Sequence, residues 1–112
     1  QATDAGEGDP AVTSVPRAAF LDQNVPNPFN PTTRIRYGVP ASAGGLVPVR
    51  LVIYDAAGRA VRTLVSGMEA PGPHGALWDG RDDAGRRVES GVYFYRLQVA
   101  GETLTRKLLL VK

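Results

Sequence analysis

The chain has 112 residues, carries a net charge of +2 and contains no cysteine. The length suits one domain, and the lack of cysteine excludes disulfide bonds, thiolate metal sites and a cysteine nucleophile. The charge is too small, and the arginines are too scattered along the sequence, to indicate binding to nucleic acid. With 13 glycines, 9 prolines and no long helical period, the composition predicts an all-β domain rich in turns.

Residues 1–20 are small, polar and acidic up to the first arginine, Arg17. Such a segment buries too little apolar surface to offset the entropy lost on ordering, so we expect a flexible acidic linker from a preceding domain. Residues 21–112 then form the domain itself. The chain does not begin with methionine and lacks the blocks of a signal peptide, so we interpret it as part of a longer protein. No apolar run approaches the roughly 18 residues of a membrane helix, so we expect no membrane insertion.

Residues 21–33 combine three prolines and three asparagines with one aromatic residue, Phe29. Proline fixes φ and pushes the preceding residue into extended geometry, so this segment should form an irregular, extended arm. We expect Phe29 to plug the open end of a sandwich and the asparagines to cap local backbone groups. A ligand-binding role for the arm is the alternative. The asparagines are Asn24, Asn27 and Asn30.

Apolar and charged residues alternate over Thr33–Val39, which predicts a half-buried strand. Its inward residues are Ile35, Tyr37 and Val39. Residues 46–54 repeat the pattern in a second strand. Residues 55–58 carry aspartate first and glycine fourth, as a type I turn followed by a left-handed residue prefers. We expect the hairpin partner over residues 60–65.

Residues 66–75 are predicted to be a loop, and they contain the only methionine and the only histidine of the chain, Met68 and His74. A single histidine without a nearby histidine, cysteine or carboxylate cluster is more often structural than catalytic or metal-bound. Residues 76–79 carry Trp78 into a strand, where we expect it to be the largest side chain of the core.

The segment 79–85 is an oxygen-rich loop with two glycines, which raises the possibility of a calcium site. However, no glutamate lies at the downstream position that an EF-hand requires, and Arg81 and Arg86 supply competing positive charge. Residues 82–85 also repeat the Asp-x-x-Gly pattern of residues 55–58, so we expect a plain turn. The weak calcium candidates are Asp79, Asp82 and Asp83.

The last 22 residues predict a β-hairpin, with a turn at residues 100–101. A two-residue turn pairs Leu97 with Leu104, Tyr95 with Arg106 and Tyr93 with Leu108. The other face of the hairpin is also apolar, at Val92, Phe94, Leu109 and Val111. A strand that is apolar on both faces is usually covered, whereas a strand at a chain end is often an edge strand. This conflict suggests that the C-terminal strand is bound by a partner.

Six or seven short strands separated by turns predict a two-sheet sandwich with antiparallel pairing. No nucleophile elbow or phosphate-binding loop is present in the sequence, and adjacent carboxylates occur only at the turn carrying Asp82 and Asp83. We therefore expect neither an enzyme nor a cofactor. Tyr93 and Tyr95 alternate with basic residues, but they lie on the core face, which disfavours binding to nucleic acid or carbohydrate.

Four blocks in succession resemble the type A C-terminal sorting domain of the type IX secretion system. They are QNVPNPFNPTTRIRYGVP (23–40), VRLVIYDAAGRAVRTLV (49–65), HGALWDGRDDAGRRVESGVYFYRLQVAG (74–101) and TRKLLLVK (105–112). The middle blocks are also similar to the immunoglobulin-like domain of the flagellar hook-capping protein. The resemblance runs from residue 21 to the end, and only the loop 41–48 is longer than the family's pattern.

The resemblance implies an immunoglobulin-like sandwich at the C-terminus of exported proteins of Bacteroidetes-like bacteria. Its implied partners are an N-terminal cargo domain, an outer-membrane translocon, a shuttle protein and a cell-surface sortase that can attach the cargo to lipopolysaccharide. The implied location is the periplasm in transit and then the cell surface or the medium, with cleavage before Leu21. The residues that match the family's recognition motifs are Gly91, Tyr93, Leu110, Val111 and Lys112.

The apolar terminal strand, Lys107 to Val111, could engage a receptor by strand addition, in which backbone bonds supply affinity and alternate side chains supply specificity. The simpler alternative is that this strand only completes the sheet. Two other interpretations of the whole chain stay open: a structural immunoglobulin-like spacer, and an adhesion module stabilised by calcium at the acidic turn. We favour the sorting signal because the chain stops soon after the hairpin.

Overall fold

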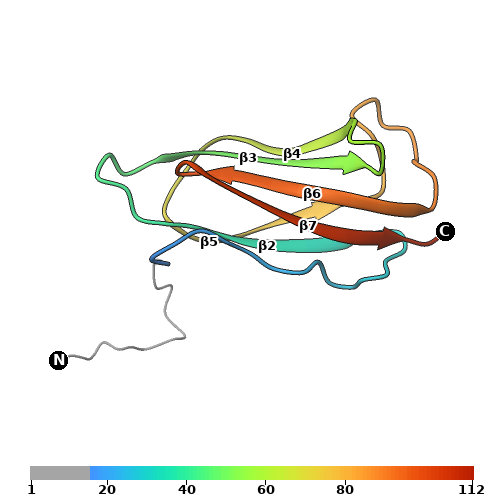
Figure 1. The fold of residues 1–112 in the computed structure, drawn as a ribbon, viewed down its shortest axis with the longest axis horizontal. Helices are drawn as coiled ribbons and strands as arrows, with labels where there is room; N and C mark the ends of the chain where they lie inside the picture. Colours follow the sequence, from blue (N-terminus) through green and yellow to red (C-terminus); the bar gives the residue numbers. More distant parts are fainter. Residues whose placement is uncertain (1–15) are drawn as a thin grey trace.

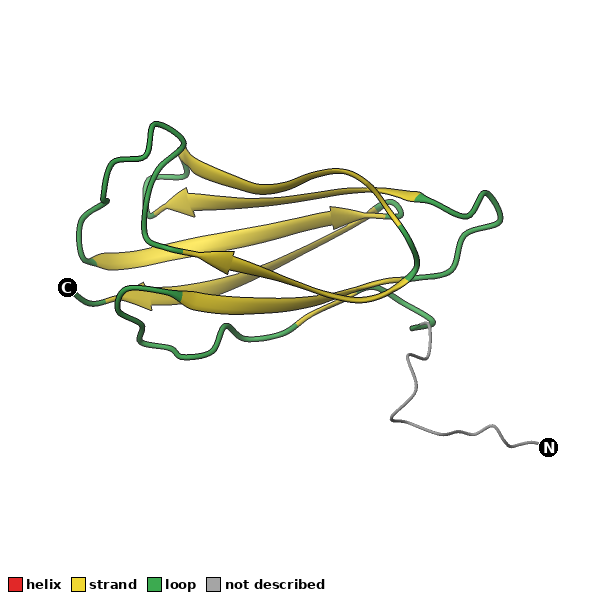
Figure 2. Cartoon of the chain, turned by 180° about the vertical axis from the view of Figure 1, so that it is seen from behind, coloured by secondary structure: helices red, strands yellow, loops and turns green. Residues whose placement is uncertain are grey.

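The computed structural model describes residues 16–112, which form seven strands in two antiparallel sheets (Figures 1 and 2). The strands are β1 (Phe20–Leu21), β2 (Thr33–Val39), β3 (Val47–Asp55), β4 (Ala60–Glu69), β5 (Gly72–Trp78), β6 (Gly91–Val99) and β7 (Glu102–Leu110). One sheet has the order β1-β2-β5 and the other the order β4-β3-β6-β7. The prediction of an all-β, two-sheet sandwich is confirmed. Within residues 16–112 the structure contains no helix long and apolar enough to span a membrane.

The core lies between the two sheets because apolar residues occupy alternate positions on their facing sides. Trp78 is fully buried at its centre, as predicted, and its ring lies 5.4 Å from the ring of Phe29 and 5.4 Å from that of Tyr93. The three predicted inward residues of β2 are also buried. They are Ile35, Tyr37 and Val39. Burying each such side chain contributes about 1.5–3 kcal/mol, so this shared interior is the main support of the fold.

The C-terminal hairpin has the predicted register, with Leu97 opposite Leu104, Tyr95 opposite Arg106 and Tyr93 opposite Leu108. Its two turn residues both have positive φ, 52° at Ala100 and 78° at Gly101. Two positive φ values define the type I′ turn, whose twist matches that of the strands it joins.

The predicted loop over residues 66–75 is wrong, because most of these residues lie in strands. β4 continues to Glu69, β5 begins at Gly72, and only two residues make the corner between the two sheets. Residues 66–69 pair in regular register with residues 47–50 of β3, and the two register shifts of this ladder lie earlier in β4, between residues 60 and 65. Pro73 is compatible with a strand because β5 lies at the edge of its sheet.

The ordered fold includes residues that the sequence assigns to the linker. Phe20 lies in β1 and pairs with Gly38, and its ring covers the face of that glycine so closely that a Cβ there would collide with it. Ala19 also packs against the core. The part of the expected linker at residues 1–15 lies outside the described residues.

Candidate recognition site

The outer edge of β7 is covered by the proline-rich arm, residues 23–31, which runs beside it toward the C-terminus (Figure 1). The backbone N–H of Phe29 donates to the carbonyl oxygen of Leu109 (3.1 Å), and the N–H of Val111 donates to the carbonyl oxygen of Phe29 (3.1 Å). These bonds form a short parallel bridge between Phe29 and Leu110. The arm therefore takes the place of a further strand at this edge.

Side chains of the arm extend this coverage. The Oδ1 atom of Asn27 accepts a hydrogen bond from the N–H of Leu109 (3.0 Å), and Nε2 of Gln23 donates to the carbonyl oxygen of Lys107 (2.7 Å). The sequence predicts a local cap for Asn27, whereas the structure pairs it with a distant strand because the arm lies against β7. A receptor strand that adds along Lys107–Val111 would therefore have to displace the arm.

The arm is anchored by buried groups at both of its ends. Phe29 is 2% exposed and packs on Trp78, which confirms that it plugs the sandwich. Asn24 is also buried, and its Nδ2 donates to the carbonyl oxygen of Pro26 (3.1 Å) and to Oγ1 of Thr33 (3.0 Å). Because these polar groups satisfy one another locally, as predicted for this asparagine, the arm can cross the end of the core without an unpaired buried amide.

Three of the six residues predicted to contact a partner are instead part of the framework. They are Gly91, Tyr93 and Leu110. Tyr93 and Leu110 are buried at 6% and 5% exposure, and the hydroxyl of Tyr93 donates to the carbonyl oxygen of Glu89 (2.6 Å). Gly91 has φ of 150°, a conformation that a side chain rarely adopts. A partner cannot contact the side chains of Tyr93 and Leu110 directly while the domain is folded, whereas Gly91 is half-buried.

The other three predicted residues, Lys107, Val111 and Lys112, are exposed. The backbone N–H of Lys112 donates to Oγ of Ser90 (3.0 Å), and its Nζ lies 3.8 Å from Oε1 of Glu89. The exposed end of the hairpin is therefore held in place, and its side chains are available to a partner.

The alternate face of the hairpin adds residues that the sequence analysis did not select as a site. On the outer face of the four-stranded sheet, Val92 lies opposite Leu109 and Phe94 opposite Lys107. Arg96 stacks over the ring of Tyr54, with its Cζ atom 4.9 Å from the ring centroid, a cation–π contact. The apolar character of both faces of this hairpin was the sequence signal for this surface.

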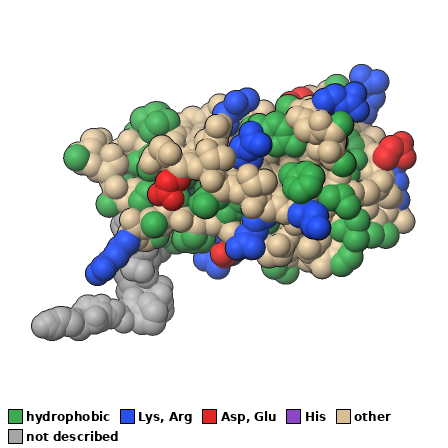
Figure 3. Space-filling view, viewed as in Figure 1, with side chains coloured by type: hydrophobic (Ala, Val, Ile, Leu, Met, Phe, Trp, Pro, Cys, Tyr) green, Lys and Arg blue, Asp and Glu red, His purple; other side chains and the backbone are tan. Residues whose placement is uncertain are grey.

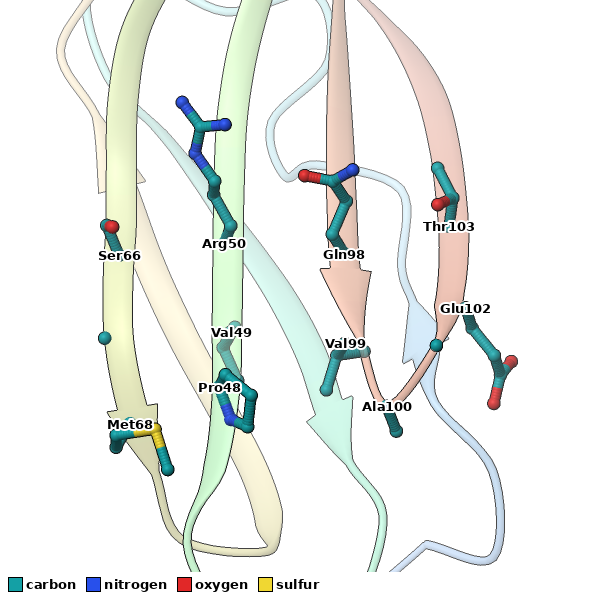
Figure 4. A pocket seen from close by; sticks show the side chains of 12 residues that line it. Pro48, Val49, Arg50, Ser66, Met68, Gln98, Val99, Ala100, Glu102 and Thr103 are labelled. Atoms are coloured by element: carbon teal, nitrogen blue, oxygen red, sulfur yellow. The ribbon is translucent and has the colours of Figure 1, made fainter.

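At the opposite end of the same outer face, beside the β6–β7 turn, lies a shallow hollow (Figure 4). Arg50, Gln98 and Thr103 point from neighbouring strands toward its open side, whereas Val49 and Val99 point into the core. The hollow contains no cluster of carboxylates or nucleophiles. Its one lining carboxylate is that of Glu102.

The acidic turn has the geometry that the sequence predicts for residues 82–85. The N–H of Gly85 donates to the carbonyl oxygen of Asp82 (2.9 Å), and Gly85 has φ of 85°. One carboxylate oxygen of Asp82 accepts hydrogen bonds from the N–H groups of Ala84 (3.0 Å) and Arg86 (2.9 Å). The carboxylate of Asp82 thus stabilises the turn.

The other two calcium candidates also have partners within the chain. Asp83 Oδ1 accepts a hydrogen bond from the N–H of Thr63 (3.1 Å), and Asp79 Oδ1 lies 3.8 Å from Nη1 of Arg62. Residues 16–112 contain no group of three or more histidine, cysteine, aspartate or glutamate side chains that could hold a metal ion. These contacts fasten the loop to the edge of β4.

Calcium is expected to leave the melting temperature of the chain unchanged, because the carboxylates of Asp79, Asp82 and Asp83 already bond to backbone N–H groups or arginine. Calorimetry with millimolar calcium, with magnesium and with EDTA measures this. A saturable rise in melting temperature that is specific to calcium and disappears in Asp82→Asn would contradict the expectation.

His74 lies in a packing contact at the corner between β4 and β5. Its ring stacks on Tyr37 with centroids 5.4 Å apart and an interplanar angle of 16°, and its Nε2 lies 2.7 Å from the carbonyl oxygen of Ala70. The Tyr37 hydroxyl donates to Oε1 of Glu69 (2.5 Å). Burial, together with this carboxylate, raises the pKa of Tyr37. The arrangement is consistent with the predicted structural role of the histidine.

Tyr37→Phe is expected to destabilise the domain by about 1–3 kcal/mol, because the phenol is buried and donates to a charged acceptor, Glu69. Urea unfolding followed by fluorescence of the single tryptophan measures the change. Tyr54→Phe is the matched control, since that hydroxyl has no hydrogen bond to another of the described residues. Equal effects of the two substitutions would contradict the role of the carboxylate.

The model of the FlgD Ig-like domain family matches residues 31–103. Among solved structures, FlgD of P. aeruginosa is 27% identical, with a TM-score of 0.53 over 70% of this chain and 60% of that one. PorZ is described as an essential bacterial surface component of the type IX secretion system of Porphyromonas gingivalis. It is 19% identical, with a TM-score of 0.54 over 84% of this chain and 11% of that one.

The chain therefore spans less than two thirds of the length of either structure. No curated protein matches it. The matches to FlgD agree with the resemblance of residues 49–65 and 74–101 to the immunoglobulin-like domain of the flagellar hook-capping protein. Because the family model matches more than half of its length, the chain belongs to the family of FlgD Ig-like domains.

Proposed function

We propose that this domain is a non-catalytic C-terminal sorting signal that directs an exported protein across the outer membrane through the type IX secretion system. The observation that carries the proposal is the final hairpin. Its Gly91 and Tyr93 opening and its Leu110-Val111-Lys112 tail resemble the motifs of that class of signal. Buried and exposed residues alternate along this hairpin. The buried motif residues hold the strands in place, and the exposed ones are accessible to a partner.

The shared fold with PorZ supports the proposal, because a surface component of the same secretion system contains a stretch of similar architecture. Under this proposal the domain passes through the periplasm and reaches the cell surface or the medium. Its partners are the translocon, the shuttle protein and, for removal before Leu21, a surface sortase. The cargo precedes the domain in the longer protein.

A second candidate function is a structural immunoglobulin-like module that spaces or supports a neighbouring domain. The family match over residues 31–103 favours this alternative, since it ends before the Leu110-Val111-Lys112 tail, and FlgD is 27% identical. A sorting signal is required for export, whereas a structural module is not.

The test is to place the full chain behind a signal peptide and a fluorescent reporter in a host with a type IX system. Export that is lost in a translocon mutant supports the sorting signal. Retention of a folded fusion in the periplasm contradicts it and favours the structural module. Resistance of the retained fusion to added protease distinguishes a folded domain from a misfolded one.

A test of the Leu110-Val111-Lys112 tail requires a deletion that leaves the domain folded. Deleting all of Lys107 to Lys112 would remove the buried Leu108 and Leu110, so the fold and the signal would be lost together. Deleting only Val111 and Lys112 removes two exposed residues and their backbone hydrogen bonds to Phe29 and Ser90, and it leaves the β6–β7 ladder intact. We expect this shorter deletion to stop export while the domain still folds, and normal export of this variant would count against a terminal signal.

A further inference from the structure

Most of the groups through which a partner was expected to bind the terminal strand are not accessible in the folded domain. The arm covers its outer backbone edge between Lys107 and Val111, and the motif side chains of Tyr93 and Leu110 are buried. The part of the hairpin that remains accessible is its outer face. A partner that binds the folded domain at this hairpin must therefore contact side chains on that face.

The outer face of β6 and β7 is apolar at the end where β7 reaches the C-terminus of the chain. Val92, Leu109 and Val111 are large apolar residues that are 41%, 37% and 45% exposed. Phe94 is half-buried between them and Tyr54. Figure 3 views this face, where hydrophobic side chains gather over β6 and β7 among lysine and arginine side chains. A contiguous exposed apolar patch with a polar rim is typical of an interaction surface.

Most charges on the same face are positive. Arg50, Arg96 and Lys107 face outward on β3, β6 and β7, whereas Glu102 lies at the opposite end of the face, where it lines the hollow beside the β6–β7 turn. None of the three basic side chains has a carboxylate within 4 Å among the described residues, unlike Arg59, which pairs with Asp55 at 3.1 Å. Charge complementarity therefore favours an acidic partner.

We propose that the outer face of β6 and β7 docks a protein surface that presents an apolar centre rimmed by carboxylates. The inference rests on the proposed function, since it names the surface through which the export machinery would hold the domain. The apolar centre meets Val92, Phe94 and Leu109, and the carboxylates meet Arg96 and Lys107.

The shape of the face favours a protein over an anionic membrane. The aromatic rings of Tyr54 and Phe94 are half-buried and lie within a sheet surface, so they do not project as anchors that could enter a bilayer. A flat apolar surface with few cations suits another folded surface, for which central apolar contacts and peripheral charge pairs are usual.

The first experiment titrates the labelled full chain with a synthetic peptide that has a central Leu-Phe pair between runs of glutamate, followed by NMR. We expect saturable amide shifts on residues 92–98 and 103–109, weakened by added salt. Arg96→Glu with Lys107→Glu should reduce the affinity about tenfold or more. Arg34→Glu with Arg86→Glu changes the net charge equally away from this face and should change the affinity less than about twofold.

Several outcomes would overturn the docking surface. They are the absence of saturable shifts, shifts confined to β2 and β5, an equal loss in both charge variants, or tighter binding to phosphatidylglycerol vesicles through the same residues. Unchanged melting temperatures of the variants show that the fold is retained. Leu109→Thr, compared with Leu77→Thr on the other sheet, separately tests the apolar contribution.

The export assay then separates this inference from the proposed function. If the wild-type fusion is exported, the Arg96→Glu and Lys107→Glu variant should remain folded in the periplasm, while the Arg34→Glu and Arg86→Glu variant is exported. Normal export of the first variant overturns the docking surface and leaves the sorting signal standing. If the wild-type fusion is not exported, the sorting signal fails, and the peptide titration alone decides the docking surface.

Discussion

Phe29→Ala is expected to destabilise the domain by about 3–5 kcal/mol, the usual range for removing a buried phenylalanine. Phe29 is 2% exposed, and its ring packs 5.4 Å from that of Trp78 at the end of the core. The substitution also loosens the anchor of the arm, whose backbone bonds to Leu109 and Val111 depend on the position of Phe29. We therefore expect a second effect, faster exchange of the Val111 amide hydrogen, even under conditions in which the variant is folded.

Urea unfolding followed by fluorescence of Trp78 measures the stability, and hydrogen exchange measures the release of the arm. The matched control is Val25→Ala, because Val25 belongs to the same arm and is 69% exposed. This control should change stability by less than about 0.5 kcal/mol. A loss below about 1 kcal/mol for Phe29→Ala, or unaltered exchange at Val111, would show that the arm is held by other contacts.

A steep loss of stability is expected as the pH rises above about 10, the pKa of an unperturbed tyrosine. Burial raises the pKa of Tyr95 to about 12, and burial also raises the pKa of Tyr37 and of Tyr93. The fold favours the neutral phenol at each position, so this stabilisation is complete below the unfolded pKa and is lost as the pH rises toward the folded pKa. The rise at Tyr95 alone corresponds to about 2 kcal/mol lost by about pH 12.

The measurement is urea unfolding between about pH 8 and pH 12, together with tyrosinate absorbance. Tyr95→Phe should lower stability at neutral pH, because the hydroxyl of Tyr95 donates to the carbonyl oxygen of Asp22 (2.6 Å). The same variant should show a pH dependence that is smaller by about 2 kcal/mol. Reversible ionisation of all the tyrosines near pH 10 in the folded domain would contradict the expectation.

The arm and the terminal strand are far apart in the chain, and their pairing has a consequence for folding. Gln23 bonds to Lys107 across 84 residues, and Arg106 donates to the carbonyl oxygen of Leu21 across 85 residues. Contacts of such separation form late because the loop-closure entropy must be offset first. The edge of β7 therefore closes only when both ends of the domain are present.

Local sequence patterns predicted the structure correctly where interactions between residues close in the chain determine the backbone conformation. Alternation predicted the inward residues of β2, the turn at residues 100–101 predicted the register of the hairpin, and the Asp-x-x-Gly pattern predicted the turn at residues 82–85. Each of these depends on side-chain parity or on the φ preference of glycine within a few residues. The prediction of a loop over residues 66–75 failed, because residues 66–69 pair in regular register with residues 47–50 of β3 and extend β4 to Glu69.

The candidate site was predicted in part. The motif predicts a recognition role for the final hairpin, and its two-sided apolarity predicts a surface for a partner; the structure shows which of these side chains are exposed. Which motif residues are buried, however, depends on the opposite sheet, which covers Tyr93 and Leu110 and leaves Val92 and Leu109 in solvent. Sequence periodicity assigns residues to two faces of a strand and cannot say which face the second sheet will cover.

The sequence by itself determined that this chain is an all-β domain with a C-terminal hairpin, because turn residues and alternation act over short distances. Only the tertiary structure decided that the arm closes the edge of the last strand. That closure depends on Asn27 and Phe29 meeting Leu109 and Val111, which are brought together by the packing of Phe29 on Trp78. The tertiary structure thereby shifted the surface available to a partner from the backbone edge to the outer face, because an edge whose hydrogen bonds are satisfied no longer attracts a strand.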